Sequence, residues 1–198
     1  MNYLAHAYLS FNDPFLLTGN MISDFVKGKK KFEYPVAIQK GIELHRAIDE
    51  FTDFHPVISK AKDLFREDYR LYSAPLVDIV FDHFLALDTI QFSENNALKN
   101  FTENTYRQLS ENTLHFPETF QRIFPFMKSQ DWLYGYSFKE GIRKSLAGLV
   151  RRANYMYESE TAFQIFEENY QKLQEYYEAF FPQLKEFASL KMRQLQAE

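Results

Sequence analysis

The segment at residues 75–88, PLVDIVFDHFLALD, is mostly apolar but carries Asp78, Asp82 and His83. On a helix, Asp78 and Asp82 share a face because they are four residues apart, and His83 lies one step further round. Most of the remaining circumference is aliphatic or aromatic, which is typical of a buried helix. A buried carboxylate is costly unless it is paired or binds a metal ion. The segment therefore predicts a compensating partner elsewhere in the chain.

Other apolar segments carry polar groups of the same kind. His6 lies in YLAHAYL, Asp24 lies in GNMISDFV, and His45 and Asp49 are helical neighbours in GIELHRAID. Imidazole and carboxylate together suit divalent cations such as Mn²⁺, Fe²⁺ or Zn²⁺, and inward-facing ligands build metal sites in helical proteins. Taken singly, His6 fits a core histidine, His45 and Asp49 an ordinary pair, and Asp24 a helix cap. Their convergence would make a metal centre.

The composition is that of a folded globular protein. The 198 residues are 45% hydrophobic and 25% charged, which suits one domain with a substantial core. The 21 Phe and 13 Tyr predict a core of large rings. The sequence has no cysteine, which excludes disulfides and thiolate metal sites and fits a reducing cytoplasm.

Membrane and nucleic acid are poor candidate partners. The N-terminal residues lack the basic start of a signal peptide, and no apolar run approaches the roughly 18 residues of a membrane span. The net charge of −4 argues against nucleic acid as the default partner. We therefore expect a cytoplasmic protein that binds neither.

The elements that must position these residues are all predicted to be helices. Apolar residues recur at helical spacing along nearly the whole chain, and the few Gly and Pro argue against a turn-rich β fold. The expected helices lie at residues 2–10, 15–27, 35–54, 55–72, 75–88, 97–114, 117–129, 138–153 and from 160 onward. No repeat or linker suggests a boundary. We predict a single all-α domain, a helical bundle spanning residues 1–198.

Particular residues predict where these helices begin and end. Pro35 and Pro56 are favourable in a first turn, and Ser73 is a candidate N-cap for the helix at 75–88. Pro182 predicts a kink or break in the last helix. Residues 131–137, DWLYGYS, read as an irregular aromatic link, and the basic stretch after Gly28 reads as a loop.

Four segments in order resemble the acyl carrier protein phosphodiesterase family, also called ACP hydrolases. They are MNYLAHAYLS, GNMISDFVKG, GIELHRAIDEFTD and DIVFDHFLALD, and they run from Met1 to about Asp88. A weaker likeness continues through WL at 132–133 and GLVRRA at 148–153. The family is similar to the HD-domain phosphohydrolases, which are all-helical metal-dependent enzymes. The resemblance therefore implies an HD-like bundle, although the usual His-Asp doublet is reversed here as Asp82-His83.

The resemblance also implies a reaction. It is hydrolysis of the phosphodiester that joins 4′-phosphopantetheine to a serine of holo-acyl carrier protein, giving apo-carrier and free 4′-phosphopantetheine, with Mn²⁺ as the expected metal. A divalent cation lowers the pKa of bound water and neutralises charge that develops on phosphoryl oxygen. We predict a metal shell of His45, Asp49, Asp82 and His83, completed by Asp24 or Asp78.

Further residues have expected roles around that shell. Asp24 is predicted to be essential, and whichever of Asp24 and Asp78 is not a ligand would orient the attacking water or hold a ligand histidine. Arg46 either contacts phosphate with two hydrogen bonds, which lysine could not do, or is a solvated helix residue. His6 is an additional candidate site residue.

The partner implied by the resemblance is acyl carrier protein, which is small, helical and acidic. A chain with net charge −4 needs a local positive surface to bind it. The candidates are Lys27, Lys29, Lys30, Lys31, Arg143, Lys144, Arg151 and Arg152, which otherwise are ordinary solubilising charges. Two other functions remain open at this point: an HD-type phosphohydrolase that acts on a nucleotide or another phosphodiester, and a non-catalytic helical module that binds an acidic protein.

Overall fold

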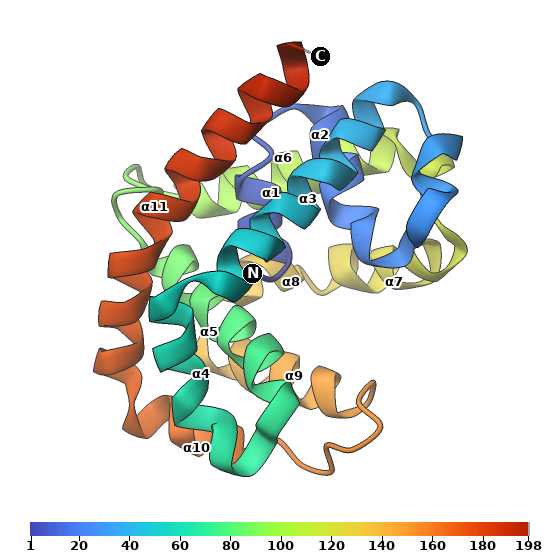
Figure 1. Cartoon of the computed structure of the whole chain (residues 1–198). Coiled ribbons are helices and arrows are strands. Elements are labelled where there is room, and N and C mark those ends of the chain that lie inside the picture. The colour runs from blue at the N-terminus through green and yellow to red at the C-terminus, as the bar shows by residue number, and fades with distance from the viewer. Residues whose placement is uncertain (198) are drawn as a thin grey trace.

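The computed structural model describes residues 1–197, and every regular element in that range is a helix (Figure 1). The α-helices are α1 (Tyr3–Tyr8), α2 (Pro14–Ile22), α3 (Val36–Phe54), α4 (Pro56–Tyr69), α5 (Ser73–Leu87), α6 (Ala97–Glu111), α7 (Glu118–Ser129), α8 (Trp132–Gly135), α9 (Lys139–Val150), α10 (Glu160–Glu168) and α11 (Tyr170–Ala197). The 3₁₀ helices are η1 (Ser23–Phe25), η2 (Gly28–Glu33), η3 (Arg70–Tyr72) and η4 (Thr113–His115). The predicted all-α class is confirmed. Glu198, the last residue of the predicted domain, lies outside the described residues.

Helices α2 and α3 approach each other closely because glycines face each other at their crossing. A Cβ atom on Gly19 would lie 2.1 Å from the Ile38 carbonyl oxygen and 2.8 Å from the Gly41 Cα. A Cβ on Gly41 would lie 2.4 Å from the Leu16 carbonyl oxygen. Any side chain at either position would push the two backbones apart. This contact sets how near the end of α2 comes to the middle of α3.

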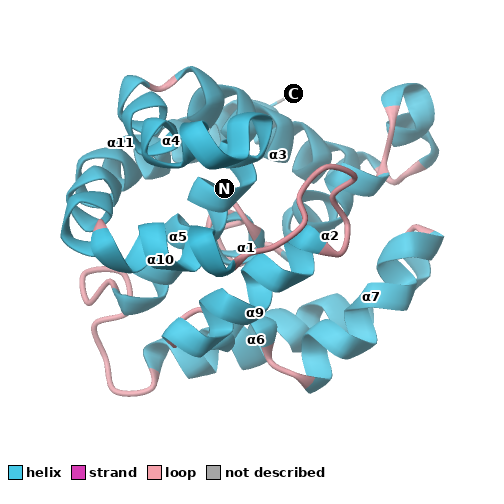
Figure 2. Cartoon of the chain, turned by 90° about the horizontal axis from the view of Figure 1, so that it is seen from below, coloured by secondary structure: helices cyan, strands magenta, loops and turns pink. Residues whose placement is uncertain are grey.

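The core is built of large rings, as the composition predicted. The largest fully buried side chains include Phe65, Phe81, Phe120, Phe166, Phe180 and Phe181. Helix α5 supplies Phe81 to this core, and the long helix α11 packs against α3, α4 and α5 along one side of the molecule (Figures 1 and 2). The predicted HD-like arrangement stays a prediction.

Helix α11 passes through Pro182 without ending. A proline in a helix interior removes one backbone hydrogen bond and clashes with the preceding turn, at a cost of about 3 kcal/mol. Its neighbours Phe180, Phe181 and Leu184 are fully buried, and each contributes roughly 1.5–3 kcal/mol by burial. Packing therefore outweighs the proline, and the predicted break is absent.

Three other local predictions differ from the structure. Ser73 is the first residue of α5 rather than its cap, because its hydroxyl donates to the Arg70 carbonyl behind it. The link DWLYGYS contains the one-turn helix α8, which is capped by Asp131. The stretch expected to be one helix to residue 27 ends at Ile22, and η1 and η2 follow it.

Within residues 1–197 no helix combines the length and the apolar character that crossing a bilayer requires. The expected cytoplasmic location stays a prediction.

Candidate metal centre

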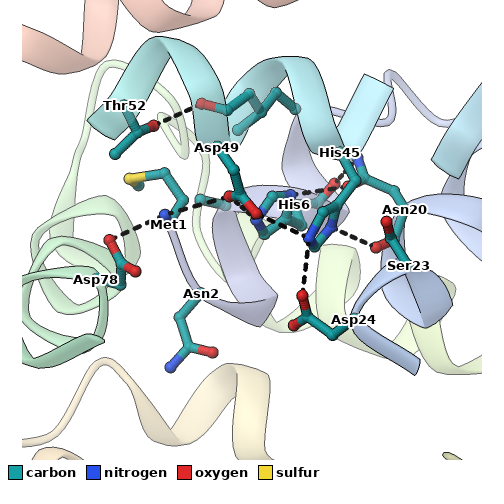
Figure 3. A network of polar contacts seen from close by, with 12 residues as sticks. Met1, Asn2, His6, Asn20, Ser23, Asp24, His45, Asp49, Thr52 and Asp78 are labelled. Carbon is teal, nitrogen blue, oxygen red and sulfur yellow. Dashed lines mark hydrogen bonds and ion pairs between the residues drawn. The ribbon is translucent and has the colours of Figure 1, made fainter. Parts of the chain in front are cut away.

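Three side chains from the N-terminal helices meet at one point (Figure 3). They are His6 from α1 and His45 and Asp49 from α3, and one ligand atom of each lies within 4.8 Å of the others. Asp49 Oδ2 is 3.0 Å from His45 Nε2, and Asp49 Oδ1 is 3.2 Å from His6 Nε2. Both imidazoles are buried, while the Asp49 side chain is 41% exposed. The cluster is therefore rooted in the core and open to solvent on one side.

Asn20 fixes the orientation of both imidazole rings. His6 Nδ1 donates to the Asn20 side-chain oxygen at 2.8 Å, and His45 Nδ1 donates to the Asn20 carbonyl oxygen at 2.7 Å. The Asn20 amide nitrogen in turn donates to the His6 carbonyl and to Ser10 Oγ, at 2.9 and 3.1 Å. The two rings stack with their centroids 3.9 Å apart. One fully buried residue thus aligns both histidines.

The helical context explains why Asn20 can do this. It lies in the last turn of α2, where carbonyl groups have no partner within the helix. The close crossing at Gly19 and Gly41 brings that free carbonyl within reach of His45. The sequence reasoning did not select Asn20. The Gly-Asn pair at 19–20, in the segment that carries Asp24, is the only signal in the sequence, because a glycine beside Asn20 allows a close backbone approach.

These hydrogen bonds decide which ring nitrogens carry protons. An Asn20 carbonyl can only accept, so His45 Nδ1 is protonated, and the same holds for His6 Nδ1 because the Asn20 amide nitrogen is already used as a donor. The Nε2 atoms of both rings therefore point into the cluster. Burial and the neighbouring His45 lower the pKa of His6, against the opposing effect of Asp49. His6 is neutral at pH 7, and its Nε2 presents a lone pair.

The Nε2 atom of His6 faces the Asp49 carboxylate at 3.2 Å. Within residues 1–197, His6 Nε2 is the buried side-chain atom without a hydrogen-bond partner, because in the neutral ring it carries no proton to donate to Asp49. Two acceptors held this close require a cation or a proton. The residues therefore fit a divalent cation with two imidazole ligands and a carboxylate.

Asp24 adds a second carboxylate at the edge of the cluster. It lies on η1, its Oδ1 is 3.2 Å from His45 Nε2, and its side chain is 66% exposed. Its pKa is lowered by the hydrogen bond with His45, against the effect of burial. Burial alone would lower the pKa of His45, but Asp24 and Asp49 outweigh it and raise that pKa to about 9. The pKa of Asp49 is lowered by His45 and His6, although burial acts to raise it.

The structure does not bring Asp82 to this group. Asp82 is fully buried, and it accepts hydrogen bonds from the backbone N–H groups of Asn2, Leu4 and Ala5, at 3.2, 2.7 and 3.3 Å. Burial raises the pKa of Asp82 to about 7, and the Met1 amino group and these N–H groups act the other way. The carboxylate thus fastens the start of α1, the helix that carries His6.

His83 and Asp78 also have partners other than a metal. His83 Nδ1 donates to the Tyr136 carbonyl at 2.6 Å, and His83 Nε2 lies 3.0 Å from the Tyr170 hydroxyl. Asp78 forms an ion pair with the Met1 amino group at 2.9 Å (Figure 3). Of the predicted metal shell, the structure therefore assembles His45, Asp49 and Asp24, with His6 added, and it leaves Asp82, His83 and Asp78 outside.

Arg46 is an exposed residue of α3 that binds the backbone just after η1. Its Nη2 donates to the Val26 carbonyl oxygen at 2.8 Å. That contact ties α3 to the chain just after η1 and so holds the segment that carries Asp24. The guanidinium keeps further N–H donors, so the predicted phosphate contact stays a prediction.

Some of the basic residues predicted to bind a partner are already paired. Lys31 Nζ lies 2.6 Å from Glu43, and Arg143 pairs with Glu160 while its guanidinium lies 3.9 Å from the Phe163 ring centre. Lys27, Lys29, Lys30, Lys144, Arg151 and Arg152 are exposed. Ion pairs with carboxylates are recorded for none of these six within residues 1–197.

Fold and site together define an all-α protein with a buried histidine–carboxylate centre near its N-terminus. Over residues 1–184 the chain matches the family described as acyl carrier protein phosphodiesterase. It is similar to the protein of that name from Yersinia pestis, with 34% identity over 92% of this chain and 94% of the relative. The relatives of the same name from Photorhabdus laumondii and Serratia proteamaculans are each 32% identical, over 96% and 95% of this chain and 96% and 97% of their own.

The chain belongs to the acyl carrier protein phosphodiesterase family, and it is a phosphoric diester hydrolase. The resemblance seen in the sequence is confirmed. No solved structure matches the chain.

Proposed function

We propose that this enzyme hydrolyses the phosphodiester between 4′-phosphopantetheine and the serine of holo-acyl carrier protein, using a divalent cation, with Mn²⁺ as the first candidate. The family match and the names of the relatives support the carrier protein as substrate. One observation carries the metal dependence: the buried Nε2 of His6 faces Asp49 without a hydrogen-bond partner.

His6, His45 and Asp49 would hold the cation, and Asp24 lies close enough to His45 to join them. A bound divalent cation lowers the pKa of water and neutralises charge on phosphoryl oxygen. Asn20 holds both imidazoles in the tautomer that leaves Nε2 free as a ligand atom. Asp24, whose pKa is lowered and whose side chain is 66% exposed, would orient the attacking water and accept its proton.

Carrier protein would dock on the basic segment that follows Asp24. Lys27, Lys29 and Lys30 are exposed, and Phe32 in the same segment is 64% exposed. This segment, residues 27–32, starts three residues after the Asp24 carboxylate and includes most of η2, so an acidic partner bound there would lie next to the cluster. Charge attraction of this kind raises the rate of association and is weakened by salt. The docking role of the other predicted basic residues stays a prediction; they are Lys31, Arg143, Lys144, Arg151 and Arg152.

The reaction can be tested with purified holo-acyl carrier protein. Metal-free enzyme should leave the mass of the carrier unchanged, and adding Mn²⁺ should convert it to apo-carrier with release of 4′-phosphopantetheine. His6→Ala and His45→Ala should abolish conversion and stoichiometric Mn²⁺ binding, whereas His115→Ala, on η4 away from the cluster, should keep both. Full conversion by EDTA-treated enzyme would refute the metal dependence, and intact holo-carrier under all metals tried would refute the substrate.

A further inference from the structure

A groove lies between α11 and the segment at residues 88–91 that follows α5 (Figure 1). Its volume is about 650 Å³, which is within the range of small-molecule sites. One wall is apolar and includes Phe84, Leu87 and Ile90, of which Leu87 is 46% and Ile90 85% exposed. The histidine–carboxylate cluster contributes no residue to this lining. We call this separate candidate site the α11 groove.

The opposite wall of the α11 groove is rich in hydrogen-bond acceptors. Glu178, Pro182 and Glu186 are four residues apart and share one face of α11. Pro182 has no N–H group, so the Glu178 carbonyl lacks the donor that an α-helix would otherwise supply. Both glutamates are exposed, and within residues 1–197 neither carboxylate forms an ion pair with lysine, arginine or histidine. The Glu178 carboxylate accepts one hydrogen bond, from the neutral Gln174 amide at 2.9 Å.

Tyr170 adds a further acceptor to the lining. His83 Nδ1 donates to the Tyr136 carbonyl, and burial lowers the pKa of His83, so the neutral ring has its lone pair on Nε2. The Tyr170 hydroxyl lies 3.0 Å from that Nε2 and donates its proton to it. The Tyr170 oxygen is thus left with its lone pairs to offer.

The strong donors of the lining are already in use. Lys185 Nζ donates to Gln91 Oε1 at 2.6 Å and to the Tyr8 hydroxyl at 3.0 Å. The Tyr177 hydroxyl donates to Asp88 Oδ2 at 2.8 Å. The lining therefore holds three carboxylates, from Asp88, Glu178 and Glu186, against the single ammonium of Lys185. A ligand that complements it brings positive charge and N–H donors on one side and an apolar surface on the other.

We propose that the α11 groove binds a protonated amine that carries an apolar body. The ammonium lies between the Glu178 and Glu186 carboxylates and donates to the Glu178 carbonyl, which uses the three donors that an ammonium group has. The apolar body covers Leu87 and Ile90, whose exposure marks the surface that a ligand would remove from water. The site is independent of the metal centre and of the proposed reaction.

The experiment is titration calorimetry of the full chain at pH 7 with three probes of one chain length: octylamine, octanoate and 1-octanol. Octylamine should bind at least about 10-fold more tightly than either of the others, and added salt should weaken it. Glu178→Gln combined with Glu186→Gln should lower octylamine affinity by about 10-fold or more, because charge-assisted hydrogen bonds are lost. Glu175→Gln, at an exposed glutamate of α11 outside the groove, is the matched control and should bind as wild type does.

Pro182→Ala tests the backbone acceptor separately. The variant restores an N–H group to α11, so the Glu178 carbonyl gains a partner within the helix. Octylamine affinity should fall several-fold while the melting temperature rises, a combination that loss of the fold cannot produce.

The other outcomes refute the proposal. If octanoate binds as tightly as octylamine, Lys185 determines the ligand and the groove binds anions. If octanol does so, the contact is apolar only. If the glutamate double variant binds octylamine as wild type does, or Glu175→Gln is equally weakened, the amine is held by general surface charge. Absence of octylamine binding at millimolar concentration would show that the α11 groove is not an amine site.

Discussion

In the metal-free protein, raising the pH should lower stability through His45. Asp24 Oδ1 and Asp49 Oδ2 lie 3.2 and 3.0 Å from His45 Nε2, and they raise its pKa to about 9 in spite of burial. In the unfolded chain a histidine has a pKa of about 6.5. Because the folded pKa is the higher one, protonated His45 stabilises the fold fully below about pH 6.5, and this contribution is lost as the pH rises through about 9.

The size of the effect follows from the difference between the two pKa values. About 2.5 units at 1.36 kcal/mol per unit give about 3 kcal/mol as an upper bound. For a protein of this size each kcal/mol moves Tm by roughly 2–4 °C. Loss of the His45 proton should therefore lower Tm by as much as about 6–12 °C between pH 6.5 and pH 9.5.

The assay is thermal melting of EDTA-treated protein, followed by circular dichroism, at several pH values from 6.5 to 9.5. Wild type is compared with His45→Gln, which cannot be protonated, and with His115→Gln, whose residue lies outside the cluster. Ionisable groups that all three proteins share affect each melting temperature equally, so their effect cancels when the variants are compared with wild type. His115→Gln should follow wild type, and His45→Gln should lose less stability over the same range. Parallel plots of Tm against pH for all three proteins would show that His45, between Asp24 and Asp49, does not hold its proton up to about pH 9.

Three further predictions concern residues that build the cluster from outside. Asn20→Ala should weaken Mn²⁺ binding by about 10- to 100-fold in titration calorimetry, because His6 loses its hydrogen bond to the Asn20 side chain and the carbonyl that binds His45 is less firmly held. Unchanged Mn²⁺ affinity would show that Asn20 does not orient the ligand histidines. Gly19→Ala should destabilise the protein to chemical denaturation by about 1–3 kcal/mol, since its Cβ would lie 2.1 Å from a carbonyl oxygen, whereas Gly135→Ala, with nothing within 4 Å, should be tolerated. Asp82→Ala should lower the free energy of unfolding by about 3–5 kcal/mol in the same assay, because it leaves backbone N–H groups buried without an acceptor. A decrease below about 1 kcal/mol would show that Asp82 does not fasten the start of α1.

The sequence was informative wherever spacing along one helix decides proximity. His45 and Asp49 are four residues apart on α3, and the structure places their ligand atoms 3.0 Å from each other. Helical periodicity and composition likewise sufficed for the all-α class and the ring-rich core. His6 was harder, because its proximity to His45 depends on how α1 and α3 lie in space.

The sequence was misleading where a polar side chain binds the backbone. Asp82 and His83 are buried polar residues in an apolar helix, and both were expected to bind a metal. Their partners are the N–H groups at the start of α1 and the Tyr136 carbonyl. Every residue offers such groups, so no residue type in the sequence marks them as partners. A buried acid or imidazole shows that compensation exists, and only the fold shows what provides it.

All three residues of the cluster come from α1 and α3, within the first 54 residues of the chain. Helices α2 and α3, which hold Asn20, His45 and Asp49, are neighbours in the sequence, so their packing closes only a short loop, costs little chain entropy and favours early formation during folding. The hydrogen bonds from the N–H groups of Asn2 and Leu4 to Asp82, which fasten the start of α1, join residues 80 and 78 positions apart. We therefore expect pulse-labelling hydrogen exchange to find α2 and α3 protected before α1, whose first turn depends on Asp82. The position of His45 and Asp49 would then be set by a local pair of helices, and His6 would join them when α1 docks on Asp82.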